Sequence, residues 1–403
     1  MARGQSRSLV PALGDNRHGS KNRSSTARSP QLPHDACPPA KGGSNSSDAA
    51  RTQTMDVSAI TRELSDLRCR VERLEATQIA TAATDVLDTS AGLYLHSVRA
   101  SEPVYEPDVY RSYTSEDVRL LRRFAVAERP ARGAFTDFLG RITDCSLVPS
   151  IRHLEGKASS TVPVPGDGFH ADTIEYLGLL RAFEEVGRNA ITVAEIGAGW
   201  APWCAAAGVI ARRRGLAADL VAIEASLAKL RLAKKHFIDN GLRPDSDADD
   251  CELFGIRTRC IHAALWTEDA DVRFPRVAEA DYGGAVVTSA AASDDRFETV
   301  AAMRLETALG AYPIIDFLHI DIHGSEAAVC AASIGHLQQC ARYVFVSTHS
   351  RSIEGDLMTT FRTAGFAALR EKPSRVDLGE WVGTLERMTT AAGGLLFRNP
   401  AVS

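Results

Sequence analysis

The residues with the clearest capacity for chemistry surround two closely spaced glycines. Residues 191–196 (ITVAEI) form a short apolar run rich in β-branched side chains, which predicts a buried strand. Gly197 and Gly199 follow, and residues 203–214 then show a helical pattern. A strand that turns through glycines into a helix gathers backbone N–H groups at one point. Such a turn is a natural cradle for an anionic or polar ligand, with a ligand-free glycine turn as the simpler alternative.

The spacing around these glycines distinguishes two kinds of nucleotide site. A dinucleotide fingerprint needs Gly or Ala at the sixth position counted from Gly197, where Pro202 stands, so that template fails. The pattern of an acid followed by three alternate glycines is matched by Glu195, Gly197 and Gly199, with Ala201 in the last position. This second pattern is the one used by methyltransferases.

Strands and helices are expected to alternate around this turn. The alternation predicts an α/β fold with a mostly parallel sheet and helices on both faces, closed by two short strands at the C-terminal end. The expected helices are 171–185, 203–214, 227–240, 298–309 and 326–339, and the expected strands are 191–196, 219–224, 256–264, 314–322, 342–348, 366–370 and 394–397.

Polar side chains stand at the carboxyl ends of several expected strands. Glu224 ends the second strand, Asp321 and His323 end the fourth, and His349 follows the fifth. In sheets of this type ligands bind at the carboxyl ends of the strands, and a carboxylate such as Glu224 can accept both hydroxyls of a ribose. Carboxylates and histidines that converge on one sheet edge predict a reactive site there.

Composition limits the classes of function. The 403 residues carry a net charge of −5, which gives no case for nucleic acid as a partner. The eight cysteines are scattered without a CxxC pair, which argues against a zinc ribbon and a disulfide scaffold and favours a reducing cytoplasm. No apolar run is long enough for a membrane span, and the start lacks the apolar core of a signal peptide.

Four segments are expected along the chain. Residues 1–54 are rich in Ser, Arg, Pro and Gly and lack a periodic apolar pattern, so we expect a disordered basic tail. Residues 82–170 are expected to form a helical and loop region, with helices near 115–127 and 134–139, that caps the acceptor side. Residues 171–403 are expected to form the main domain, and its residues 270–297 are expected to add to the acceptor pocket.

The second of these segments, residues 55–81, carries a short heptad. Apolar residues recur at spacings of 3, 4, 3, 4 and 3, with charged residues between them, which is an a/d pattern. The pattern predicts a coiled-coil helix and homo-oligomerisation through residues 57–74, with an amphipathic helix that packs on its own domain as the alternative. The a/d positions are Val57, Ile60, Leu64, Leu67, Val71 and Leu74.

Four motifs in order resemble those of FkbM-type S-adenosylmethionine-dependent methyltransferases, over about residues 170–370. The strand-four motif of that family reads roughly I-D-x-E-G-x-E, and His323 stands here where the middle acid would be. The residues after the fifth strand, VFVSTHS at 344–350, are also similar. The four motifs are VAEIGAGW at 193–200, VAIEA at 221–225, HFIDNGL at 236–242 and FLHIDIHGSE at 317–326.

The resemblance implies a class I methyltransferase fold, S-adenosylmethionine as cofactor and methyl transfer to oxygen. Sugars and secondary metabolites are the acceptors it suggests, so the partner would be a small molecule or a glycan. Ala263, Ala264 and Leu265 would flank the adenine. The implied cofactor-binding residues are Glu195, Gly197, Ala198, Gly199, Glu224, Ala225 and Ala264.

Three residues are candidates for the chemistry itself. His349 is the favoured general base because the ordinary pKa of histidine lies near neutrality. Asp321 would orient the acceptor or that base, and His323 lies beside it. No metal is expected, although a metal on Asp321, His323 and Glu326 is the alternative way to lower the pKa of a hydroxyl. Structural, hydrogen-bonded histidines are the simpler explanation of both His323 and His349.

Two other functions compete with methyl transfer. A nicotinamide-dependent oxidoreductase would use a similar sheet, but Pro202 stands against it. A catalytically silent scaffold, in which oligomerisation through the heptad is the function, is left open by Ala201 and His323, which both depart from the methyltransferase patterns.

Overall fold

A computed structural model describes residues 113–127, 129–276, 284–286, 295–379 and 383–402. The chain divides into two compact units, residues 1–85 and 86–403, and all described residues belong to the second. The expected tail at 1–54 and the heptad at 55–81 lie outside the described residues. None of the helices in the described ranges is both long and apolar enough to cross a membrane.

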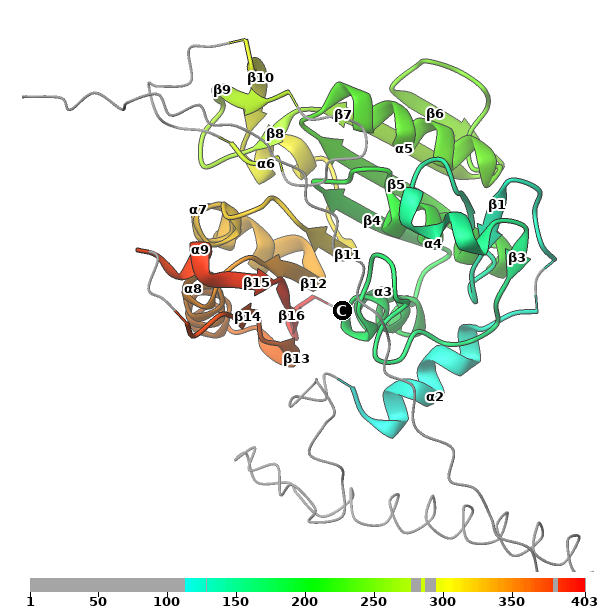
Figure 1. Cartoon of the computed structure of the whole chain (residues 1–403), viewed down its shortest axis with the longest axis horizontal. Coiled ribbons are helices and arrows are strands. Elements are labelled where there is room, and N and C mark those ends of the chain that lie inside the picture. Colours follow the sequence, from blue (N-terminus) through cyan, green and yellow to red (C-terminus); the bar gives the residue numbers. More distant parts are fainter. Residues whose placement is uncertain (1–112, 128, 277–283, 287–294, 380–382, 403) are drawn as a thin grey trace, which may run out of the picture. The chain divides into compact units, whose positions relative to one another are not determined.

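An eight-stranded sheet forms the centre of the described unit (Figure 1). All neighbouring strands pair in parallel except β16, which is antiparallel to both its neighbours, and β6 at the edge. The expected α/β class with a mostly parallel sheet is therefore confirmed. In sheet order the strands are β13 (Ala367–Lys372), β16 (Gly393–Arg398), β12 (Ala341–Thr348), β11 (Ile315–Ile320), β4 (Ala190–Ile196), β5 (Ala217–Glu224), β7 (Ile256–His262) and β6 (Asp250–Leu253).

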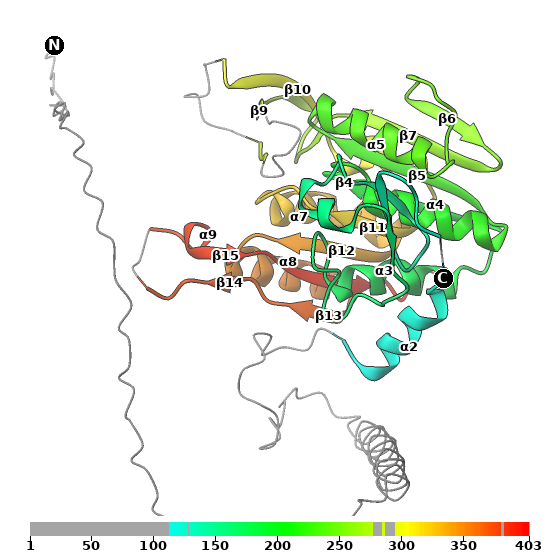
Figure 2. The same cartoon turned by 45° about the vertical axis from the view of Figure 1, so that its right-hand side comes forward.

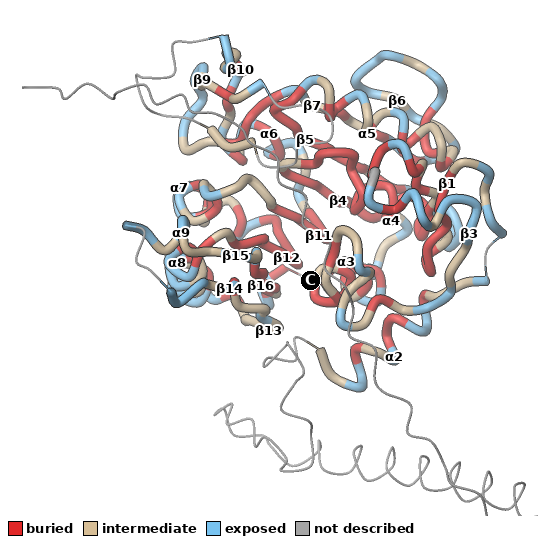
Figure 3. Tube along the Cα trace, viewed as in Figure 1, coloured by how far each residue is buried: buried red, intermediate tan, exposed pale blue. Residues whose placement is uncertain are grey.

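Helices cover both faces of this sheet, as the alternating pattern predicts. One apolar core joins the sheet to α3 (Thr173–Glu185), α4 (Pro202–Arg214) and α5 (Leu227–Asp239). A second core lies on the opposite face, under α6 (Leu305–Leu309), α7 (Glu326–Cys340) and α8 (Arg351–Thr363). Figure 2 shows the same helices and strands from a second side, and the burial colouring shows that the central strands are buried (Figure 3). Burial on both faces explains why these strands read as continuous apolar runs.

Smaller elements surround the sheet. Residues 113–158 contribute α2 (Ser115–Phe124), a small sheet and the 3₁₀-helix η1 (Pro149–Leu154). A second small sheet follows β7, and a two-stranded ribbon with α9 (Leu385–Met388) precedes β16. Their strands are β1 (Ala134–Thr136), β2 (Ile142–Asp144), β3 (Lys157–Ala158), β8 (Ala264–Leu265), β9 (Ala270–Pro275), β10 (Phe297–Met303), β14 (Arg375–Val376) and β15 (Thr389–Ala391).

Three local predictions are wrong. The expected helix at 134–139 begins with strand β1, which pairs with β2 and β3. The first half of the expected helix at 298–309 belongs to strand β10, where Val300 and Ala302 are buried and Ala301 between them is exposed, so burial there repeats every two residues. The second half contains the short helix α6. The aspartates between residues 243 and 252 predict a solvated loop, but the end of this segment instead enters edge strand β6. In each case pairing with a distant segment overrides the local pattern.

Candidate functional site

The glycine turn between β4 and α4 forms one wall of a cavity at the carboxyl ends of the central strands. Gly197 and Gly199 line this cavity, and both have positive φ angles, 69° and 55°. Ala198 is buried behind them, and its N–H donates to the carbonyl of Ile223. Ala201 also has a left-handed backbone, with φ of 53°, at the N-cap of α4. The last position of the motif therefore has the conformation that glycine adopts most readily.

Gly197 is also a point of close approach between two strands. A Cβ atom at this position would lie 1.9 Å from the backbone oxygen of Asp321. The N–H of Asp321 donates to the carbonyl of Ile196 at 2.9 Å, which joins the ends of β4 and β11. The glycine turn and the Asp321 segment therefore form one tightly packed unit at the edge of the cavity.

Glu224 contributes an acidic group to the same cavity. Its carboxylate accepts the backbone N–H of Gly199 through Oε2 and that of Ser226 through Oε1, both at 2.8 Å. Each oxygen has capacity for one more donor, so the group can still accept hydroxyls from a ligand. Ala225 and the buried Lys229 line the cavity beside it. Lys229 was not predicted as a residue of this site. Its position in the first turn of the helix that follows Glu224 could have indicated it.

Apolar side chains form the opposite wall. Ala263, Ala264 and Leu265, which were expected to flank a base, all line the cavity. Phe274 from β9 and Val286 join them. These two belong to the region 270–297 that was expected to build the acceptor pocket. None of the described residues before Gly197 lines the cavity.

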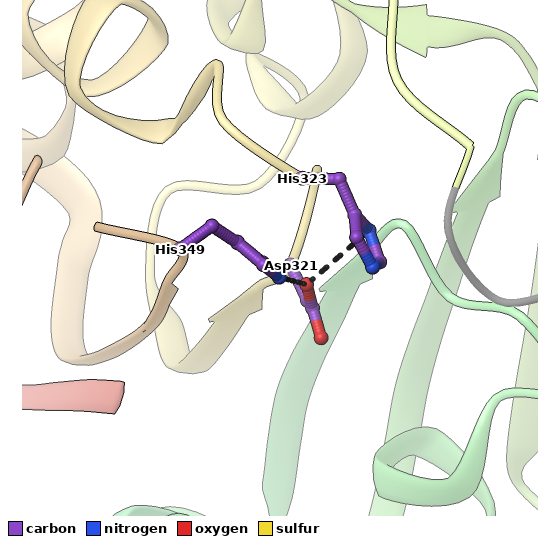
Figure 4. Close-up of side chains that lie close together, drawn as sticks. All are labelled: Asp321, His323 and His349. Carbon is purple, nitrogen blue, oxygen red and sulfur yellow. Dashed lines mark ion pairs between the residues drawn. The ribbon is translucent and has the colours of Figure 1, made fainter. Parts of the chain in front are cut away.

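Asp321, His323 and His349 lie close together (Figure 4). The parallel pairing of Ile320 with Val346 brings the segments after β11 and β12 side by side. Oδ1 of Asp321 lies 3.5 Å from Nε2 of His349 and 3.7 Å from Nδ1 of His323. Asp321 and His323 line the cavity. The three candidate residues for chemistry are therefore brought together, as expected.

Glu326, in the first turn of α7, supports this cluster. It is fully buried, and its carboxylate accepts the N–H of Ile322 at 3.2 Å and that of Gly324 at 2.8 Å. The same carboxylate holds Nδ1 of His349 at 2.8 Å. This leaves Nε2 of His349 facing Asp321. Glu326 therefore orients His349 and shapes the turn. It is not the third ligand beside Asp321 and His323 that the metal alternative in the sequence analysis assumed.

The two histidines of the cluster have opposite pKa shifts. Burial lowers the pKa of His323, and the neighbouring His349 acts in the same direction, against the charge of Asp321. Burial alone would also lower the pKa of His349, but the hydrogen bond that its ring donates to Glu326, together with the charges of Asp321 and Glu326, outweighs burial and raises this pKa. His323 also has a strained positive φ of 53°. The rings lie 4.3 Å apart between centroids.

Glu195 does not line the cavity, although it was expected to bind a cofactor. It is buried beneath the glycine turn, where Oε2 accepts the backbone N–H groups of Trp203 at 3.1 Å and Cys204 at 2.9 Å. These are among the N–H groups at the start of α4 that have no partner within the helix. Glu195 therefore caps α4 from inside the core and acts on the glycine turn only by positioning it.

Replacing Glu195 with Gln is expected to flatten the pH dependence of stability. Burial raises the pKa of Glu195 from its ordinary 4.5 to about 8, against the opposing hydrogen bond from Cys204. The folded state then holds this proton more tightly than the unfolded state. The free energy of unfolding should fall as pH rises between about 4.5 and 8, by up to about 1.4 kcal/mol per pH unit.

Urea unfolding at about pH 5 and pH 8 measures this effect. Gln keeps an oxygen for the two N–H groups but cannot ionise, so its fall in stability should be smaller than that of the wild type. The exposed Glu252 supplies the control, Glu252→Gln, which should keep the wild-type slope. Burial also raises the pKa of Glu175 to about 8, so Glu175 contributes equally to the pH dependence of stability in every variant. Equal slopes for Glu195→Gln and wild type would contradict the assignment.

Comparisons with known proteins agree with a methyltransferase-like chain. No model of a protein family matches the sequence. A protein of Jannaschia sp. (strain CCS1) named "Putative methyltransferase" is 29% identical over 255 residues, which cover 60% of this chain and 85% of that protein.

Solved structures of methyltransferases also match the chain, at low similarity. The methyltransferase FkbM from Methylobacillus flagellatus KT is 12% identical with a TM-score of 0.32, over 55% of this chain and 54% of that chain. Precorrin-6y C5,15-methyltransferase from Geobacter metallireducens GS-15 is 8% identical with a TM-score of 0.32, over 57% and 90%. The order and direction of the strands themselves define the fold as Rossmann-like, with β16 antiparallel within the sheet.

Proposed function

We propose that this chain is an S-adenosylmethionine-dependent methyltransferase that methylates a hydroxyl oxygen of a sugar or a secondary metabolite. One observation carries the proposal. A single cavity joins the glycine turn, the acid at the end of β5 and the Asp321–His323 segment at the end of β11. The methyltransferase name of the Jannaschia relative supports the reaction class. The oxygen acceptor follows from the resemblance to FkbM-type enzymes in the sequence motifs.

The walls of the cavity fit the parts of this cofactor. The Gly197–Gly199 turn would hold its amino-acid end, because backbone approaches closely there and no side chain blocks it. Glu224 would accept the ribose hydroxyls with the free capacity of its two oxygens. Ala263, Ala264 and Leu265 would flank the adenine. When bound, S-adenosylmethionine supplies a methyl group on a positively charged, strongly electrophilic sulfur.

The residues of the chain then have two tasks. The cavity must hold the acceptor oxygen in line with the methyl group, and a reactive group must deal with the hydroxyl proton. Asp321 and His323 line the cavity, and His349 lies beside Asp321, which supports this cluster as the reactive group. Glu326 fixes the ring of His349 through Nδ1 and leaves Nε2 as the basic atom. In the simplest form of the proposal, Nε2 of His349 accepts the proton.

The sheet weighs against the oxidoreductase alternative. A dinucleotide-binding sheet of the 3-2-1-4-5-6 order is parallel throughout. Here the antiparallel β16 lies between β12 and β13, and Pro202 occupies the position of the last glycine in the dinucleotide fingerprint. The scaffold alternative depends on the heptad, which lies outside the described residues. The cavity that joins the expected cofactor-binding residues gives no reason to infer that the site is catalytically inactive.

Titration calorimetry on the full chain tests the proposal. We expect S-adenosylhomocysteine to bind and NAD not to bind. Glu224→Ala should weaken S-adenosylhomocysteine binding by about 10- to 150-fold, because each hydrogen bond to a charged group contributes roughly 1.5–3 kcal/mol. The control is Glu252→Ala, which removes an exposed glutamate that pairs with Arg257 and should leave binding unchanged.

The remaining outcomes separate the alternatives. Binding of NAD but not of S-adenosylhomocysteine would overturn the methyltransferase proposal. Binding of S-adenosylhomocysteine without turnover on a broad panel of hydroxylated acceptors would favour the scaffold. Unchanged affinity in Glu224→Ala would place the donor elsewhere than in this cavity.

A further inference from the structure

We propose that Asp321, His323 and His349 form a binding site for a single divalent transition-metal cation that holds the acceptor hydroxyl. The inference rests on the proposed function for its chemical role, but the site itself is argued from geometry alone. Among the described residues, this is the group of histidine, cysteine and acidic side chains whose ligand atoms lie close enough to share one ion, all within 4.8 Å of one another.

The distances fit a shared ion better than direct hydrogen bonds. Oδ1 of Asp321 lies 3.5 Å from Nε2 of His349 and 3.7 Å from Nδ1 of His323. Both exceed the usual length of an N–H···O hydrogen bond, about 2.7–3.2 Å. Two ligand atoms that each lie about 2.1 Å from a tetrahedral ion are separated by about 3.4 Å. An ion between the three side chains would need only small side-chain movements.

Oδ1 of Asp321 is the atom that most needs such a partner. It is shielded from solvent and accepts no hydrogen bond from any described residue. A carboxylate oxygen in this condition is costly unless it meets a positive charge. Figure 4 shows the two imidazoles approaching it from either side. A cation at their meeting point would satisfy this oxygen and use one nitrogen of each ring.

A buried carboxylate stands behind one of the ligands. Nδ1 of His349 is held by Glu326 at 2.8 Å, so Nε2 is the atom left to face Asp321. Metal-binding histidines nearly always donate their second ring N–H to a carboxylate, a carbonyl or water, which fixes the ring and raises its basicity. Glu326 is fully buried and also bonded to two backbone N–H groups, so it is rigidly placed for this task.

The surrounding charge suits one divalent cation. Asp321 and Glu326 are the acidic groups that act on the two rings, and Lys229 is the cationic side chain that acts on His323 from α5. Two imidazoles and one carboxylate favour ions such as Zn²⁺ or Co²⁺ over Mg²⁺ or Ca²⁺, which prefer all-oxygen sites. Asp321 and His323 line the cavity, so a remaining coordination position could face the acceptor.

With the cation bound, His349 serves as a ligand and no longer as the base. Coordination lowers the pKa of the acceptor hydroxyl, whose proton leaves to solvent. The new O–C bond forms as the S–C bond breaks. The products are a methyl ether, S-adenosylhomocysteine and one proton, so atoms and charge balance.

Metal titration of the full, metal-stripped chain tests the site without any need for activity. Co²⁺ is followed by its visible absorption and Zn²⁺ by calorimetry. We expect saturable binding of one ion, with visible bands of a nitrogen and oxygen ligand set; thiolate charge-transfer bands would instead indicate binding at a cysteine and count against the site. Glu326→Gln should weaken binding by about 10- to 100-fold, and the ligand variants by at least as much.

The ligand variants are chosen to fold. Asp321→Asn keeps the shape of the side chain, and His323→Gly removes the imidazole at a position whose φ of 53° suits glycine. The matched control is His153→Ala, an exposed histidine of η1 outside the cluster. Binding by wild type and His153→Ala with loss in Asp321→Asn and His323→Gly would support the site. Absence of saturable binding, or equal affinity in all four proteins, would overturn it.

Parallel titrations with S-adenosylhomocysteine keep this inference separate from the proposed function. If S-adenosylhomocysteine binds and neither ion does, the cation site is wrong, while the donor site stands with His349 as the base. If Co²⁺ binds through Asp321 and His323 but S-adenosylhomocysteine does not bind, the cation site stands and the methyltransferase proposal fails.

Discussion

Replacing His349 with alanine is expected to lower kcat for methyl transfer by about 10²- to 10⁴-fold while the affinity for S-adenosylhomocysteine stays near the wild-type value. A positioned proton acceptor contributes an effect of this size, and loss of a ligand of the proposed cation would lower kcat as well. His349 lies 3.5 Å from Asp321, and it is not among the residues that line the cavity proposed for the donor. Its loss should therefore affect the reacting oxygen and leave the donor in place. Steady-state kinetics and calorimetry on the same preparation measure the two effects.

The control for this variant is again His153→Ala, which removes an exposed histidine from η1 and should leave kcat unchanged. Glu326 keeps its two backbone N–H donors when His349 is removed, so the fold should survive the substitution. A variant that loses donor affinity and thermal stability together would show that His349 is a structural residue. A variant with unchanged kcat would remove the cluster from the reaction.

Replacing Gly197 with alanine is expected to destabilise the fold and abolish donor binding together. A residue other than glycine at φ of 69° costs roughly 1–2 kcal/mol, and forcing a methyl group into packed surroundings costs about 1–3 kcal/mol more. The new Cβ would lie 1.9 Å from the backbone oxygen of Asp321, so the ends of β4 and β11 must separate. A displacement of about 1 Å at a reacting group costs about 10²-fold in rate.

Gly215→Ala is the matched control, because Gly215 has almost the same φ, 68°, but no atom within 4 Å of a Cβ built there. Gly215→Ala should lose only the stability that the backbone strain costs. Its affinity for S-adenosylhomocysteine should stay normal. Urea unfolding and calorimetry compare the two variants. If Gly197→Ala were no less stable than Gly215→Ala and bound the donor equally well, the close packing of the turn against Asp321 would be wrong.

The fold class and much of the candidate site could be predicted from the sequence. The apolar runs at β4, β5, β11 and β12 are buried on both faces, so hydrophobicity alone marks them as strands of a parallel sheet. The chain direction then places the residue after each strand at the same edge. For this reason Glu224, Asp321 and His349 could be assigned to one site before their distances were known.

Predictions from local patterns were wrong where distant segments decide the conformation. Residues 134–136 form a strand because β2 and β3 pair with it, and β10 is a strand because β9 does. Helical and extended patterns differ little in such short segments, so a few inter-strand hydrogen bonds are enough to select one. Phe274 reaches the cavity from β9, within the region 270–297 that was expected to build the acceptor pocket, but the strand that carries it was not predicted.

The chemical roles of individual side chains were decided only by the tertiary structure. Glu195 and Glu224 are both acids at strand ends, yet Glu195 caps α4 from the core and Glu224 lines the cavity. Glu326 is likewise separated from the ligand set that the sequence suggested, because its carboxylate is taken up by His349 and two backbone N–H groups. Residue type and spacing determine which groups reach the sheet edge. The direction of each side chain, and the partner it meets there, depend on packing between elements far apart in the chain.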